Sequence, residues 1–199
     1  MKPLILASTS PYRRALLDDL GLQYTAAAPL FEEVDPGGLT PQTLAETFAR
    51  GKAASLRQEY PDSLIIGSDQ VPALGESILR KPGTLEAAAN QLMALSGRTH
   101  KLITAVALLD SGTGEWFEDT VVHEMEMREL TREYAEFYVS RDNTIDCAGA
   151  YKIEATGTTL FRRMEGRDHT SIIGLPIGIL GNLIDAAERT WLARLGHSR

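Results

Sequence analysis

Short apolar runs alternate along the chain with stretches in which apolar residues recur at helical spacing. The runs predict strands at residues 4–7, 63–68, 101–109, 116–127, 151–154 and 158–161. Capping signals and 3.6-residue periodicity predict helices at residues 10–21, 40–60, 84–95, 131–139 and 175–191. Strands and helices therefore alternate from one end of the chain to the other.

This alternation favours an α/β fold with a twisted sheet flanked by helices. The segment 110–114 has the residue types of a tight turn between two strands, which makes the sheet mixed rather than wholly parallel. A chain of 199 residues can bury one sizeable core but not two comfortable ones, so we expect a single domain over residues 1–199.

Charge and cysteine content limit the partners and the cell compartment that we expect for the protein. The 20 Lys and Arg residues against 27 Asp and Glu residues argue against nucleic acid or an anionic membrane as a partner. The apolar run 4–7 is too short for a signal peptide, and the later apolar stretch 172–184 is broken by glycine and proline. With Cys147 as its single cysteine, the chain fits a reducing cytosol, and we expect a cytoplasmic protein.

The first predicted strand, turn and helix form a candidate phosphate site. Ser8, Ser10, Arg13 and Arg14 surround one helix N-terminus, where free amide groups and the helix dipole favour an anion. The alternative is that Ser10 only caps the helix and both arginines point into solvent. The sequence contains neither a Walker A motif nor GxGxxG, so the two commonest phosphate loops are excluded.

Three further charged residues would complete such a site if they converge on it. Lys52 shares a helical stripe with Leu44 and Phe48, and either reaches a pocket or extends into water. Lys81 precedes Pro82, which restricts its backbone, although a surface turn is the plainer interpretation. Asp69 follows the strand predicted at residues 63–68, where it could activate water, bind a divalent cation or simply form a turn.

Taken together, these residues make the sequence similar to the Maf-like nucleoside triphosphate pyrophosphatases, and the resemblance covers essentially the whole chain. The resemblance lies in residues 6–14, Lys52, residues 67–70, 80–82, 148–154, 160–161, 165–168 and 174–176, in family order. It implies a mixed α/β fold like that of inosine triphosphate pyrophosphatases, with two lobes around a central cleft. It also implies a cytoplasmic enzyme that uses a divalent cation, Mg²⁺ or Mn²⁺, and that forms a homodimer.

The family reaction would be hydrolysis of a nucleoside triphosphate between its α and β phosphates. The resemblance makes Asp69 the proton acceptor, and it places Ser8, Arg13, Arg14, Lys52 and Lys81 around the phosphates, beside the candidate Ser10. Of three acidic residues in the loop after residue 31, Glu33 is our first choice to bind the metal together with Asp69.

Three positions distinguish branches of the family, and here they are Tyr12, Gln70 and Glu154. An aromatic residue, Gln and Glu resemble the branch that hydrolyses 7-methyl-GTP, whereas Arg, Thr and Gln would be expected for dTTP or UTP. Methylated guanine is positively charged, so it would stack on Tyr12 with a cation–π component, and Glu154 could accept hydrogen bonds from its N1–H and amino group. Tyr12 replaces the tryptophan expected in this branch, which predicts somewhat weaker stacking and a broader preference.

We therefore expect a pyrophosphatase that removes 7-methyl-GTP or a similar modified purine nucleotide from the nucleotide pool. Two alternatives remain open. One is the same reaction on dTTP or UTP. The other is a nucleotide-binding regulator of cell division or septum formation, a role that is associated with the family.

Overall fold

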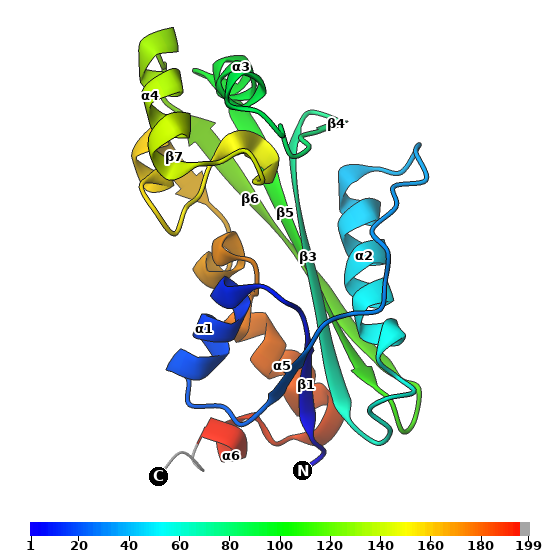
Figure 1. The fold of residues 1–199 in the computed structure, drawn as a ribbon. Coiled ribbons are helices and arrows are strands. Elements are labelled where there is room, and N and C mark those ends of the chain that lie inside the picture. The colour runs from blue at the N-terminus through cyan, green and yellow to red at the C-terminus, as the bar shows by residue number, and fades with distance from the viewer. Residues whose placement is uncertain (196–199) are drawn as a thin grey trace. The chain divides into compact units, whose positions relative to one another are not determined.

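The computed structural model of the chain describes residues 1–195, which form a mixed α/β fold (Figure 1). The strands are β1 (Leu4–Ala7), β2 (Thr25–Ala27), β3 (Leu64–Leu74), β4 (Ser77–Ile78), β5 (Thr99–Asp110), β6 (Trp116–Met127) and β7 (Phe161–Glu165). The α-helices are α1 (Pro11–Asp19), α2 (Pro41–Ser55), α3 (Leu85–Leu95), α4 (Arg132–Asp142), α5 (Ile177–Glu188) and α6 (Trp191–Leu195). Short 3-10 helices occupy Ala148–Ala150, Gly157–Leu160 and His169–Ile173.

The strands of this part of the chain follow the order β2-β1-β3-β5-β6-β7, with β4 paired to β3. β1 pairs in parallel with β2 and β3, whereas β4 and β7 run antiparallel to their partners β3 and β6. The sheet is therefore mixed, which confirms the α/β prediction and its mixed sheet.

The chain divides into two compact units. Within the described residues, unit 1 comprises residues 1–70, 104–121 and 168–195, and unit 2 comprises residues 71–103 and 122–167. Three of the four boundaries fall inside β3, β5 and β6, and the fourth lies between β7 and the 3-10 helix His169–Ile173.

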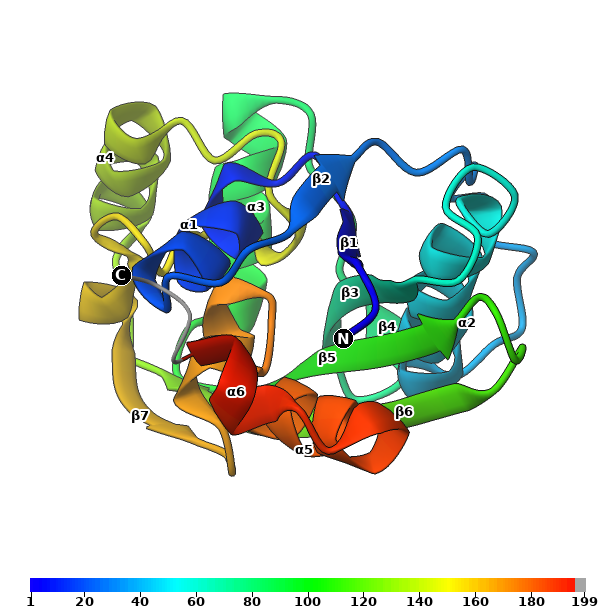
Figure 2. The ribbon, with the colours of Figure 1, turned by 90° about the horizontal axis from the view of Figure 1, so that it is seen from below.

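In unit 1, alternate residues of the central strands face two separate apolar layers. Leu4, Leu6, Leu64 and Ile66 pack with residues of α1 and α5, including Leu17 and Ile184. Their neighbours Ile5, Ala7 and Ile65 instead pack with Ala53 and Leu56 at the end of α2. This period-2 alternation is what a strand buried on both faces requires. Figure 2 shows α2 and α5 on opposite sides of the strands.

Unit 2 has its own core, in which α3 packs against α4. A ring cluster of His100, Tyr151 and Phe161 is buried there, and the rings of Tyr151 and Phe161 meet edge to face at 5.1 Å. Burial lowers the pKa of His100 to about 4, so its imidazole is neutral at physiological pH. Its Nε2 lies 2.9 Å from the Tyr151 hydroxyl.

The structure confirms most predicted elements but changes β3. The strand does not end before Asp69: it continues to Leu74, so Asp69 and Gln70 lie inside it. The polar pair suggested a strand end, but Asp69 is neutralised by a lysine from α2, and the apolar residues that follow continue the strand. The prediction that an acid follows the strand was therefore wrong.

Three predictions in the last third of the chain also need correction. Residues 151–154 form no strand, because the 3-10 turn before them contains Gly149 and Ala150 at φ 84° and 59°, and a turn follows. Residues 158–161 are mostly 3-10 helix, and the strand begins only at Phe161. The last predicted helix is split into α5 and α6 at Arg189, whose φ of 57° ends α5. The short strands β2 and β4 were not predicted.

None of the helices within residues 1–195 combines the length and the apolar character needed to cross a membrane.

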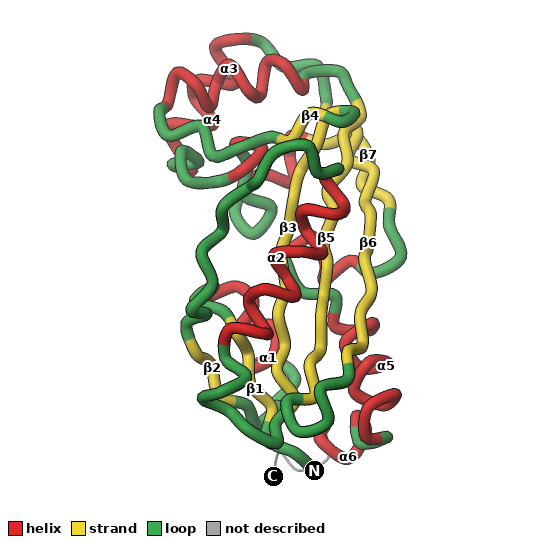
Figure 3. Tube along the Cα trace, turned by 90° about the vertical axis from the view of Figure 1, so that its right-hand side faces the viewer, coloured by secondary structure: helices red, strands yellow, loops and turns green. Residues whose placement is uncertain are grey.

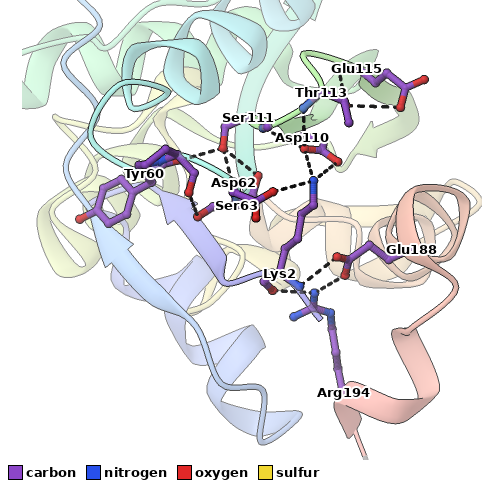
Figure 4. Close-up of polar contacts among 12 residues, drawn as sticks. Lys2, Tyr60, Asp62, Ser63, Asp110, Ser111, Thr113, Glu115, Glu188 and Arg194 are labelled. Atoms are coloured by element: carbon purple, nitrogen blue, oxygen red, sulfur yellow. Dashed lines mark hydrogen bonds and ion pairs between the residues drawn. The ribbon is translucent and has the colours of Figure 1, made fainter.

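An ion-pair cluster at Lys2 joins sequence-distant elements of unit 1 (Figure 4). The Lys2 ammonium lies 2.6 Å from Asp110 Oδ1 at the end of β5 and 3.1 Å from Asp62 Oδ1 before β3. The Lys2 amide donates to Glu188 at the end of α5, and Arg194 of α6 donates both to Glu188 and to the Lys2 carbonyl. The cluster therefore ties the N-terminus to β5 and to the last two helices.

Asp110 is expected to make this unit sensitive to acid. Burial alone would raise the pKa of Asp110, but hydrogen bonds from Lys2 and from the Thr113 and Gly112 amides outweigh it and lower the pKa. A lowered folded-state pKa gives stability that is present above the unfolded value of about 4 and is lost as the pH falls through the folded value. Asp110→Asn should lower the free energy of unfolding at pH 7 by about 1–3 kcal/mol and flatten its acid dependence.

The measurement is urea unfolding at a series of pH values. Asp62→Asn is the matched control, because it pairs with the same ammonium through a side chain that is 80% exposed rather than 7%. Its effect should stay within about 0.5 kcal/mol. Equal losses for the two variants would show that burial of Asp110 does not matter.

Candidate active site

The centre of the candidate site is a buried lysine that contacts two carboxylates of unit 1. The Lys52 ammonium lies 2.6 Å from Asp69 Oδ1 and 2.7 Å from Glu33 Oε1. Lys52 is 5% exposed and Asp69 is 7% exposed, whereas the Glu33 side chain is half exposed. The predicted residues Lys52, Asp69 and Glu33 are therefore brought together, and the alternative in which Lys52 extends into water is wrong.

Close packing of α2 on β3 makes this contact possible. A Cβ added at Gly67 would lie 2.0 Å from the Ala49 carbonyl oxygen, so only glycine allows the helix to lie this near the strand. Figure 3 shows α2 lying along β3. Lys52, in the last turn of α2, then reaches Asp69 two residues beyond Gly67.

The N-terminus of α1 carries the predicted phosphate cluster. Ser10 caps the helix by accepting from the Arg13 amide, and the Ser8 hydroxyl accepts from the Ser10 amide. Arg13 donates through Nε to the Gly174 carbonyl at 2.8 Å, and its Nη1 lies 3.5 Å from Ser8 Oγ. Arg14 is exposed and donates to the Thr9 carbonyl, and Tyr12 in the same turn is 41% exposed.

Opposing effects set the charge state of Asp69. Burial raises the pKa of its carboxyl, Lys52 and Arg13 counteract that rise, and Glu33 adds to it, with a net shift upward. Burial also lowers the pKa of Arg13, which Asp69 and Glu33 oppose, and a guanidinium remains charged in any case. A carboxyl with a raised pKa that stays paired with cations is a common arrangement for a general base.

Gln70, the next residue of β3, is held through its amide nitrogen. Nε2 donates to the carbonyls of Ser171 and Ile172, at 2.8 and 3.1 Å, and to Thr104 Oγ1 at 3.0 Å. Ser68, on the other side of Asp69, is 1% exposed, and its Oγ lies 2.9 Å from the carbonyl oxygens of both Ala105 and Gly174. Sequence reasoning missed Ser68 and Thr104 as parts of the site. A lone threonine inside the apolar run 102–109 was the available signal.

Two predicted site residues, Lys81 and Glu154, belong to unit 2. Lys81 is exposed, directly before Pro82. Glu154 is exposed in a turn whose two ends are held by α4. Lys152 donates through its ammonium to the carbonyls of Asp142 and Asn143, and Thr156 donates to the Asp142 carboxylate. The prediction that Glu154 lies in a strand was therefore wrong: Glu154 lies on a turn that is tied to α4.

Fold and site together define a mixed α/β protein with a candidate anion site. Unit 1 presents the start of a helix, two arginines and a carboxylate that is buried against a lysine. Such a set can bind phosphate oxygens and accept a proton beside them.

The family model described as "Maf-like protein" matches residues 3–187, and the chain belongs to this family. Several relatives are named 7-methyl-GTP pyrophosphatase. The protein from Syntrophotalea carbinolica is 43% identical and covers 89% of this chain and 90% of its own. Those from Pseudomonas putida and Bdellovibrio bacteriovorus are each 46% identical, covering 89% and 94% of this chain and 92% and 98% of their own.

Among solved structures, the chain is similar to a nucleoside-triphosphatase, also titled dITP/XTP pyrophosphatase, from Mycobacterium abscessus. The TM-score is 0.43 and the identity 18%, over 64% of this chain and 75% of the other. A likeness this weak supports no inference about fold or function.

Removing the ammonium of Lys52 should raise the pKa of Asp69 further. Lys52 lowers that pKa, so in Lys52→Met the effects of burial and of Glu33 are left with less opposition. The pKa is read from the pH titration of the Asp69 side-chain carboxyl signal in ¹³C NMR, assigned with Asp69→Asn. Lys101→Met, which removes an exposed lysine of unit 2, is the control and should leave the titration unchanged. An unshifted Asp69 in Lys52→Met would contradict the electrostatic account.

Proposed function

We propose that the protein hydrolyses 7-methyl-GTP between its α and β phosphates, releasing the nucleoside monophosphate and pyrophosphate. The observation that carries the proposal is the buried Asp69, held by Lys52 and with its pKa raised, in the same unit as the arginines of α1. The names of the relatives, at 41–46% identity over most of the chain, support this substrate.

In this mechanism Asp69 accepts a proton from a water molecule while the oxygen of that water forms a bond to the α phosphorus. The bond from that phosphorus to the bridging oxygen breaks, and pyrophosphate leaves with the electron pair. Arg13, Arg14 and the amides at the start of α1 bind phosphate oxygens and offset their charge, with Ser8 as a further donor. Lys52 lowers the pKa of Asp69 and so favours its ionised form, and Ser10 contributes by capping α1.

The donor set fits a divalent cation such as Mg²⁺ or Mn²⁺. Glu33 and Asp69 already converge on one cationic nitrogen, so their oxygens can also share one metal ion. Residues 1–195 contain no group of three or more His, Cys, Asp or Glu side chains that could hold a metal. Two carboxylates completed by phosphate oxygens and water are a common environment for Mg²⁺. Bound there, the ion would offset charge on the phosphate oxygens.

For recognition of the base, we propose stacking on the exposed ring of Tyr12 and hydrogen bonds to Glu154, with Gln70 as the third residue. The roles of Glu154 in reading the base and of Lys81 at the phosphates are supported by the resemblance to the family. The same resemblance supports a single functional domain and a cytoplasmic homodimer, and the acidic charge balance argues against nucleic acid as a partner.

The proton-transfer role of Asp69 is tested by Asp69→Asn. Without the carboxylate, kcat for 7-methyl-GTP should fall by roughly 10²–10⁴-fold. The fold should persist, because Lys52 keeps Glu33 as a partner. Steady-state release of pyrophosphate measures kcat, circular dichroism checks the fold, and Asp62→Asn is an exposed control in the same unit. Full activity in Asp69→Asn would remove this residue from the mechanism.

Substrate preference is tested by Tyr12→Arg and Glu154→Gln. Each should reduce the ratio of kcat/KM for 7-methyl-GTP to that for dTTP more than it reduces total activity, because the stacking or the carboxylate acceptor is lost. Phe137→Arg and Glu124→Gln change exposed residues of the same types elsewhere and should leave the ratio unchanged. Equal loss on all substrates would contradict base recognition, and a wild-type preference for dTTP would overturn the substrate assignment.

A further inference from the structure

Several side chains of the candidate site donate hydrogen bonds to the backbone carbonyls of one short segment of unit 1, residues 168–174. The Gly174 carbonyl accepts from Arg13 Nε at 2.8 Å, and it shares the Ser68 hydroxyl, at 2.9 Å, with the Ala105 carbonyl. The Ser171 carbonyl accepts from Gln70 Nε2 and from Thr104 Oγ1. The orientations of Ser68, Gln70 and Arg13 therefore depend on the path of this segment.

Gly174 determines where its own carbonyl points. Its φ of 117° and ψ of 6° lie in a region that residues with a Cβ rarely adopt. A Cβ added there would also lie 3.3 Å from Arg13 Nε, so a side chain at residue 174 would strain the backbone and press on the guanidinium.

Asp168 ties the start of the segment to the first turn of α5. Its Oδ1 accepts from the amide and hydroxyl of Thr170, and its Oδ2 accepts from the amides of Gly178 and Ile179 in the first turn of α5. The residue at the N-cap position of α5 is Pro176, which has no capping side chain. The Asp168 carboxylate, eight residues before Pro176, therefore supplies the acceptors and the negative charge that a helix N-terminus favours.

We propose that Asp168 and Gly174 are positioning residues, which hold Arg13 and Gln70 in the orientation needed for substrate. With Nε tied to Gly174, the fork of Nη groups of Arg13 is set in one direction. With both N–H groups of its amide shared among three acceptors, Gln70 can offer a ligand only its oxygen. The proposal rests on the proposed function, because it assumes that Arg13 binds the phosphates.

Two variants and one control test the proposal. Gly174→Ala and Asp168→Asn should each lower kcat/KM for 7-methyl-GTP by about 10- to 100-fold, the scale of a small misplacement in an active site. Both should also weaken the binding of inorganic pyrophosphate in calorimetric titration. The control is Asp185→Asn, which removes a similar acceptor at the other end of α5, where Asp185 accepts from the Trp191 amide. It should lower the melting temperature but leave kcat/KM unchanged.

A readout without substrate separates this proposal from the proposed function. The Arg13 Nε–H signal in ¹⁵N NMR, assigned with Arg13→Lys, should exchange slowly with solvent in the wild type and faster in Asp168→Asn and Gly174→Ala. It should stay slow in Asp185→Asn. Exchange that is unchanged in Asp168→Asn would overturn the positioning role, even if the enzyme is active. Equal losses of kcat/KM in Asp168→Asn and Asp185→Asn would also overturn it, because the effect would then be one of stability. If exchange is faster in the two variants but the wild type does not hydrolyse 7-methyl-GTP, the positioning role stands and the proposed function is rejected.

Discussion

The ammonium of Lys52 is the charge on which the rest of the candidate site depends. A carboxylate inside a buried strand is costly unless a cation accompanies it, and Asp69 meets that requirement through a single lysine at 2.6 Å. The pairing requires α2 to lie almost against β3, which Gly67 allows by having no Cβ. Packing and electrostatics thus impose one shared constraint, since a helix held further from the strand would leave Asp69 with only the more distant positive charge of Arg13.

Two elements that meet in unit 1 fix the remaining polar groups. The start of α1 supplies backbone amides and arginines, and the segment 168–174 supplies carbonyl acceptors that hold Arg13 and Gln70. Groups with matched donors and acceptors keep their orientation before a ligand arrives, so little has to reorganise when a phosphate binds. The site is in this sense built from backbone as much as from side chains.

Sequence patterns predicted the parts of this structure that follow from local chemistry. Ser10 followed by Pro11 marked the start of α1, and Thr40 followed by Pro41 marked that of α2, because capping is decided by a few neighbouring residues. The course of β3 through Asp69 could not be read in this way, because the lysine that neutralises the carboxylate lies 17 residues earlier in the chain. The turn that carries Glu154 was mistaken for a strand because it is shaped by long-range contacts. Lys152 and Thr156 bind Asp142 at the end of α4, and the spacing of apolar residues gives no sign of such contacts.

The balance of charges in unit 1 gives a physical reason to expect a metal ion with the substrate. Arg13, Arg14 and Lys52 exceed Asp69 and Glu33 by a single positive charge, and Lys52 already has both carboxylates as partners. A nucleoside triphosphate brings several negative charges, more than this surplus and the partial charge of one helix N-terminus can offset. A divalent cation that enters with the phosphates would supply the difference, and it would find two carboxylates placed to share it. Glu33 and Asp69 would hold the ion, and Lys52, which pairs with the same two carboxylates, would add its positive charge beside it to offset that of the phosphates.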